Sequence, residues 1–144
     1  MISEYLALVF ASLFAGAAFY INFAEQPARL LLSPNSLLKQ WAPSYKRGFA
    51  MQATLAVLSG AAALYSYSFT KNWMWIIGAG FILMNWPYTL LVIMPTNHKL
   101  IAVKDGDASS REVELIIHWG KLHAVRTGLG FSAVIVFLIA LAKP

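Results

Sequence analysis

Four long apolar segments limit what this chain can fold into more than any other feature. They cover about residues 3–24, 45–69, 73–94 and 120–142. Each is long enough to cross the roughly 30 Å hydrocarbon core of a bilayer as a helix, at about 1.5 Å per residue. We therefore predict an all-α integral membrane protein, a four-transmembrane-helix bundle. The chain leaves no room for a separate soluble domain, so residues 1–144 are expected to form one domain.

Composition supports the membrane assignment and excludes several kinds of site. Charged residues make up 12% of the chain, about half of the roughly 25% found in soluble domains. There is no cysteine, which excludes disulfides, thiolate metal sites and cysteine nucleophiles. The net charge is +5, but the basic residues lie near the ends of the apolar segments and form no stripe or tail. We therefore expect the lipid bilayer as a partner, and no nucleic acid.

The segments differ in their connections and in their regularity. About twenty residues, 25–44, join the first two segments and carry Leu and Trp at helical spacing, which predicts a short interfacial helix. Pro87 lies inside the third segment and should kink it, because proline removes a backbone donor and clashes with the preceding turn. Glycine and alanine occur in all four segments and would allow close helix packing in lipid.

Basic residues are distributed unevenly between the two sides of the predicted bundle. The side opposite the two long connections carries only Lys71 and Lys143. The first and third connections carry Arg29, Lys39, Lys46, Arg47, Lys99, Lys104, Arg111 and Lys121. The positive-inside rule then places both long connections in the cytoplasm and both termini outside. We expect the membrane to be a bacterial inner (plasma) membrane.

Polar side chains gather at the same, predicted cytoplasmic, ends of the segments, whereas the outer halves carry almost none. The gathered residues are Asn22, Glu25, Gln26, Arg29, Tyr45, Arg47, Gln52, Asn85, Thr96, Asn97, His98, His118, Trp119, His123 and Arg126. Polar groups at membrane depth are costly and usually face a bundle interior or a water-filled cavity. This convergence predicts a cavity in the cytoplasmic half, lined by Glu25, Asn97, His123 and Arg126.

Helical spacing relates the residues that open the fourth segment. Trp119, His123 and Arg126 fall at i, i+4 and i+7 and share one face. His118 is five residues before His123, about 140° around the helix, so this helix alone cannot point both histidines at one metal ion. His118 is more simply explained as an interfacial residue.

The end of the first segment offers a second group. Asn22, Glu25, Gln26 and Arg29 fall at i, i+3, i+4 and i+7. Glu25 could instead form a structural salt bridge at the end of the bundle, for example with Arg29. Glu25, His98 and His123, from three helices, could also form a two-histidine, one-carboxylate metal site. His98 has the alternative of a solvated loop residue.

Three stretches resemble one family. "EQPARLLL" follows the first segment, "PTNHKL" follows the third, and "HWGKLHAVRTGLGF" opens the fourth. Together they resemble the small four-helix membrane proteins known as DUF1772, or anthrone oxygenase-like. The matching positions are Glu25, Pro27, Ala28, Arg29, Pro95, Asn97, Leu100, Trp119, His123 and Arg126. The resemblance covers nearly the whole chain, and it leaves His98 and His118 outside the motif.

The resemblance implies a four-span bundle and an oxygenase, since some fungal members oxidise anthrones to anthraquinones with molecular oxygen. The first hypothesis is therefore a membrane-embedded oxygenase or oxidoreductase acting on a lipophilic, anthrone- or quinone-like small molecule. His123 or Glu25 would remove a proton from an activated carbon, and Arg126 and Asn97 would stabilise the resulting oxyanion. Anthrones are acidic enough for a reaction with oxygen that needs no cofactor.

Other cofactors and functions stay open at this stage. A haem held by His123 and a non-haem metal are alternatives, with His98, His118 and Trp119 as weaker cofactor-binding candidates. The second hypothesis is a non-enzymatic membrane protein that binds a lipid or cofactor, or a transporter or assembly subunit. A row of ionisable groups across the whole membrane would favour transport, and the outer halves lack one. A homo-oligomer is compatible with the sequence.

Overall fold

The computed structural model describes residues 1–142, and these are helical apart from short connections. Lys143, counted above for orientation, lies outside the described residues. Four helical spans are long and apolar enough to cross a membrane: Ile2–Arg29, Pro34–Thr70, Met74–Ile101 and Ser110–Ala142. The predicted all-α bundle with four spans is confirmed, and it is consistent with an integral membrane protein.

The spans differ in regularity. The second is α3 (Pro34–Thr70) and the fourth is α7 (Ser110–Ala142). The first consists of α1 (Ile2–Tyr20), the π-helix η1 (Ile21–Glu25) and α2 (Gln26–Arg29). The third consists of α4 (Met74–Leu83), α5 (Asn85–Tyr88), the π-helix η2 (Thr89–Ile93) and α6 (Met94–Ile101).

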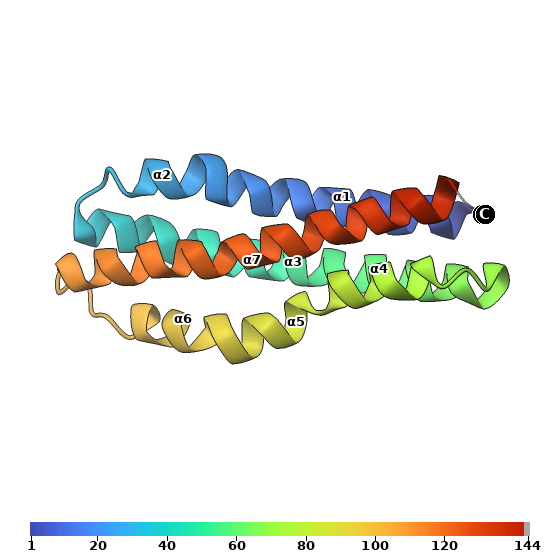
Figure 1. Cartoon of the computed structure of the whole chain (residues 1–144). Helices are drawn as coiled ribbons and strands as arrows, with labels where there is room; N and C mark the ends of the chain where they lie inside the picture. Colours follow the sequence, from blue (N-terminus) through green and yellow to red (C-terminus); the bar gives the residue numbers. More distant parts are fainter. Residues whose placement is uncertain (143–144) are drawn as a thin grey trace.

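The bundle is elongated, and the start of α1 and the end of α7 lie at one end of it (Figure 1). The connections 30–33 and 102–109 lie at the opposite end, which we call the loop end. The first and third spans each pack between α3 and α7. The basic connections therefore share one end, as predicted, while the side of the membrane that they face stays a prediction.

Small residues hold the terminal half together. The buried stripe of α1 contains Ala7, Ala11, Ala15 and Ala18. In α4, a Cβ added at Gly78 would lie 2.2 Å from the ring of Phe137 on α7. The ring therefore packs directly on the glycine backbone. The prediction that small residues permit close helix packing is confirmed for these contacts.

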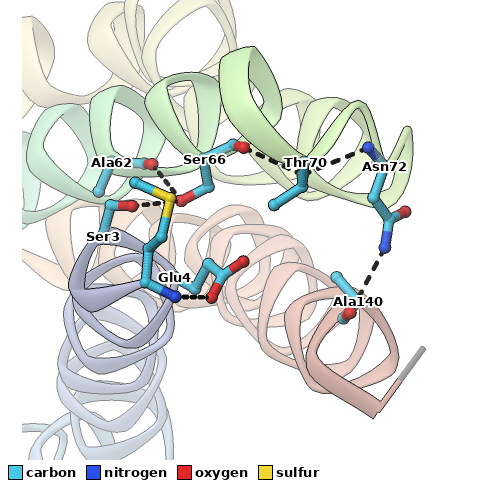
Figure 2. A network of polar contacts seen from close by, with 8 residues as sticks. Ser3, Glu4, Ala62, Ser66, Thr70, Asn72 and Ala140 are labelled. Carbon is cyan, nitrogen blue, oxygen red and sulfur yellow. Dashed lines mark hydrogen bonds and ion pairs between the residues drawn. The ribbon is translucent and has the colours of Figure 1, made fainter. Parts of the chain in front are cut away.

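Neutral hydroxyl groups add hydrogen bonds at the terminal end (Figure 2). The Ser66 hydroxyl lies 2.9 Å from the Ser3 hydroxyl on α1, and both side chains are buried. Nearby, the Asn72 amide donates to the carbonyl of Ala140 at 3.4 Å. The terminal half thus contains more polar contacts than the sequence suggested, but those just named are between neutral groups and join the ends of helices.

The predicted short interfacial helix does not exist as a separate element. α3 begins at Pro34 and continues through Pro43 to Thr70. The reason is packing: Leu37 and Trp41 are fully buried and join Ile116 and Trp119 of α7 in one apolar cluster. The stretch therefore extends the bundle along its axis instead of lying flat on the membrane.

Prolines interrupt the first and third spans. α4 ends at Leu83, the residue whose carbonyl the ring of Pro87 would meet, and Figure 1 shows the span bending there. The two π-helices each end two residues before a proline, Pro27 after η1 and Pro95 after η2. Such π-bulges are frequent at functional sites, and both of these border the cavity described next.

Candidate active site

A small cavity lies in the loop half, enclosed by all four spans. Its volume is about 20 Å³, which is room for about one water molecule. Ile21 of η1 and Ile93 of η2 contribute to its wall. The residues with polar side chains in its wall are Arg29, Ser44, Tyr45, Gln52, Thr89, Asn97, Trp119, His123 and Arg126. The cavity therefore gathers three of the four predicted site residues, Asn97, His123 and Arg126.

His123 is fixed by Asn22, which lies on η1. The imidazole Nδ1 is 2.9 Å from the Asn22 Oδ1, and the Thr127 hydroxyl donates to the same oxygen at 2.8 Å. The Asn22 Nδ2 donates to the carbonyl of Gly120 at 2.9 Å. A flipped amide would place its oxygen against that carbonyl, so the orientation of Asn22 is determined.

This orientation assigns the histidine tautomer. Since the Asn22 Oδ1 is an acceptor, the His123 Nδ1 carries the hydrogen. In the neutral ring the Nε2 is then an acceptor. It has no hydrogen-bond partner among residues 1–142. His123 is 1% exposed and lines the cavity, so it offers a shielded basic nitrogen to a bound molecule.

Trp119 packs between His123 and Arg29. The indole stacks on the imidazole with ring centroids 5.0 Å apart. The Arg29 guanidinium lies over the indole, 5.5 Å from its centroid. Trp41 meets the indole edge-on at 6.0 Å. These contacts hold the imidazole plane, and Trp119, a weaker cofactor-binding candidate from the sequence, lines the cavity.

Arg126 is a buried cation without an acidic partner. Its side chain packs over the ring of Phe14 at 5.5 Å, and the residue is 7% exposed. No carboxylate of the described chain pairs with it, and its Nε has no hydrogen-bond partner. A buried charge of this kind is unfavourable unless an anion or dipole compensates for it.

Other polar atoms around the cavity also lack partners. Asn97 is fully buried, and its Oδ1 accepts no hydrogen bond within the described chain. The same holds for both amide atoms of Gln52 and for the Thr89 hydroxyl. Buried polar groups are usually satisfied, and exceptions call for an unseen water or ligand. A cavity of one water volume cannot satisfy all of them, so several of these groups stay without a partner in the described chain.

Glu25 lies next to the cavity without lining it. Its Oε1 accepts from Arg29 at 2.5 Å, from Gln40 at 3.0 Å and from the Ser44 hydroxyl. This is the structural salt bridge considered above. Glu25 therefore holds Arg29, whose guanidinium reaches the cavity wall.

The predicted metal set is not assembled. His98 on α6 is exposed and does not line the cavity, and His118 on α7 is also exposed. Within residues 1–142 no three His, Asp or Glu side chains gather as metal ligands. His123 is the one such side chain in the cavity wall, and two arginines, Arg29 and Arg126, line the same space. That donor set does not fit a metal cation.

Sequence reasoning noted several of these residues without giving them roles. Asn22 and Gln52 stood among the gathered polar side chains, while Thr89 was not singled out. A lone amide inside an apolar segment, as at Gln52, indicates a side chain that faces the bundle interior, so this residue could have been predicted to line the site. The unpartnered hydroxyl of Thr89 carries no signal in the sequence, because threonine is common in helices that cross lipid.

In sequence, the chain is similar to known proteins of one family. The sequence profile of the family described as "Anthrone oxygenase" matches residues 41–136. An anthrone oxygenase of Claviceps purpurea is 28% identical, over 90% of this chain and 83% of its own length. Anthrone oxygenase ptaC of Pestalotiopsis fici is 28% identical, over 73% of this chain and 84% of its own. Anthrone oxygenase tpcL of Aspergillus fumigatus is 27% identical, over 88% and 85%. No solved structure matches the chain.

Proposed function

Because this chain belongs to the anthrone oxygenase family, we propose that it is a membrane-embedded oxygenase acting on a lipophilic, anthrone- or quinone-like aromatic at the loop end of the bundle. The observation that carries the proposal is the buried, unpaired Arg126, one helical turn from His123, whose Nε2 has no hydrogen-bond partner in the described chain. A buried base beside a buried cation suits a substrate that becomes an anion during reaction.

The first step is proton removal. The His123 Nε2 takes a proton from the acidic ring carbon of an anthrone, and the electron pair left behind delocalises onto the ring oxygen. Arg126 balances the charge of this oxyanion, and Asn97 donates a hydrogen bond from its amide. Asn22 holds the hydrogen on Nδ1, so that Nε2 is the basic nitrogen. Glu25 acts indirectly by holding Arg29.

Oxygen then oxidises the anion. The carbanion transfers electrons to O₂ and forms a carbon–oxygen bond, and the proton on His123 passes to the resulting peroxide. His123 next removes the second hydrogen from the same carbon, the O–O bond breaks and hydroxide leaves with that proton as water. One anthrone and one O₂ give one anthraquinone and one water. No step needs a reductant.

The substrate must widen the cavity. A space of about 20 Å³ is far below the roughly 300–1,000 Å³ of pockets that hold drug-sized ligands. The π-helices η1 and η2 border the cavity, and neighbouring hollows adjoin it. Binding therefore requires side chains to move apart, and this gives the enzyme a way to keep water out before the substrate arrives.

The test is turnover by the purified protein in detergent. We expect 1,8-dihydroxyanthrone to be converted to the anthraquinone with one O₂ consumed per product, at a rate well above that of protein-free micelles. The absorption spectrum and metal content of the same sample should show neither haem nor stoichiometric metal. Turnover that tracks bound iron or copper would refute the cofactor-free mechanism, and no turnover would refute the enzyme.

One observation favours a second candidate function. Arg29 and Arg126 line the same small space, which suits an anionic lipophile that is bound without reaction. On this alternative, the protein would bind a carboxylate-bearing lipid tightly and would not convert an anthrone. The same preparation distinguishes the two, since a binding protein retains its ligand unchanged.

A further inference from the structure

A row of hollows leads from the lipid-facing surface to the cavity. A surface groove of about 390 Å³ lies along α3 beside Trp86 of α5, and Ala53, Val57 and Leu58 form part of its wall. A second hollow of about 10 Å³ shares Ala53 and Trp86 with this groove. The second hollow and the cavity share Phe49, Gln52, Thr89 and Arg126. The surface groove and the cavity are therefore linked through the second hollow, which Arg126 also lines.

Gln52 stands where the second hollow meets the cavity. It is fully buried, and neither its Nε2 nor its Oε1 has a partner within the described chain. The Thr89 hydroxyl, which borders the same two spaces, is also unpartnered and 3% exposed. An amide and a hydroxyl together can donate to and accept from an oxygen on the edge of a planar ring system. Both are unused until a ligand arrives.

The Trp86 side chain, which lies between the surface groove and the second hollow, is held by weak contacts. Trp86 is 39% exposed, and its indole N–H donates to the carbonyl of Ala53 at 3.4 Å, longer than a strong hydrogen bond. The helix that carries Trp86 is interrupted at Met84 on one side and becomes the π-helix η2 on the other. A short segment between two irregularities can shift with less loss of helical hydrogen bonding than a continuous helix.

From these contacts we propose that the substrate enters sideways from the lipid, between α3 and α5, and that Gln52 binds an oxygen on its edge. Trp86 is the gate, and the occupant is a planar lipophilic aromatic with oxygen substituents. The ligand class rests on the proposed function. Gln52 and Arg126 lie at the inner end of the route. A plain lipid chain would leave both polar groups without a partner, so it would not occupy the route.

The access route is tested by binding kinetics with 1,8-dihydroxyanthraquinone, followed in detergent by its absorbance. Ala53→Leu narrows the route and should slow association and dissociation together by about tenfold, leaving Kd within about twofold. Trp86→Ala should speed both. The matched control is Ala17→Leu, which adds the same bulk to the other adjoining groove, of about 490 Å³, between the first span and α3. It should change neither rate.

These binding measurements distinguish a failure of the proposed access route from a failure of the proposed oxygenase function. Slowing by Ala17→Leu without slowing by Ala53→Leu would place the entrance in the other groove and overturn the proposal. Unchanged rates in both Ala53→Leu and Trp86→Ala, or no saturable binding by wild type, would also overturn it. The predicted rate changes without any oxygen consumption from an anthrone would sustain the route and refute the oxygenase.

Gln52 is tested by comparing two probes. Gln52→Met keeps the length of the side chain and removes its amide. It should raise the Kd for 1,8-dihydroxyanthraquinone about tenfold while leaving that for anthracene, which has no oxygen, unchanged. Equal loss for both probes would mean that Gln52 only shapes the space, and no loss for either would mean that it does not contact the ligand. Both results contradict its assigned role.

Discussion

His123 and Asn22 are joined by a contact of 2.9 Å between the imidazole Nδ1 and the amide Oδ1, across two spans and 101 positions of sequence. The same amide donates to the Gly120 carbonyl, so it can accept from the imidazole in one orientation only. The basic nitrogen of His123 is therefore set by a residue on a different helix.

Removal of this partner should impair the reaction without removing the base. Asn22→Leu leaves the imidazole free to rotate and to carry its hydrogen on either nitrogen, so kcat should fall about 10–100-fold with little change in KM. Steady-state oxygen consumption measures this. Asn35→Leu, which removes an amide at the loop end outside the cavity, should leave both constants unchanged. Equal losses in the two variants would make Asn22 merely structural.

Arg126 should be needed for activity but not for stability. Arg126→Met removes a buried cation that has no acidic partner, so the thermal midpoint in detergent should stay the same or rise. Activity should fall by about 10²–10³-fold because the oxyanion loses its counter-charge. Arg126→Lys should also lose activity, since an ammonium does not reproduce the planar fork. The exposed Arg111→Met is the control. A large drop in the midpoint with normal turnover per folded molecule would contradict this role.

Glu25 should show the opposite pattern. Glu25→Gln weakens the pairing with Arg29, whose side chain is 2% exposed, and the thermal midpoint should fall. Turnover per folded molecule should stay within about threefold of wild type, far from the 10²–10⁴-fold expected for a lost general base. Glu114→Gln, on an exposed position of α7, should change neither quantity. If Glu25→Gln removes turnover while the midpoint is unchanged, Glu25 takes part in the chemistry.

Orientation in the membrane is tested with topology reporters. The basic connections lie at the loop end, so a reporter inserted in "DGDASS" should report the cytoplasm, and one fused at the C-terminus should report the outside. The reverse result would move the active site to the outer face. Reports of the same side would conflict with the four-span arrangement.

The spans were predictable because the length of an apolar run can be counted in the sequence. The four runs correspond to the four helical spans. Asn97, His123 and Arg126 were also predictable, since a polar side chain at membrane depth has few places to face except the interior. The prediction of a separate interfacial helix was wrong, because the Leu and Trp residues at helical spacing in 25–44 include Leu37 and Trp41, which pack on α7 instead of lying on the membrane surface.

The spacing of residues along the first span could not predict which neighbouring helix the Glu25 side chain contacts. Glu25 and Gln26 differ by about 100° around a helix, so the two edges of one polar face meet different neighbours. Gln26 donates to the carbonyl of Ile116 on α7, whereas Glu25 binds Gln40 and Ser44 on α3. Which neighbour lies on which side is a property of the assembled bundle.

The central claim is that the cavity base is His123. The most direct measurement is the rate of oxygen consumption with 1,8-dihydroxyanthrone, in wild type and in His123→Ala shown to be folded by its thermal midpoint. If the Nε2 removes the proton, the variant should lose about 10²–10⁴-fold in rate, while His118→Ala, on the exposed side of the same helix, should match wild type. Equal rates in wild type and folded His123→Ala would contradict the account.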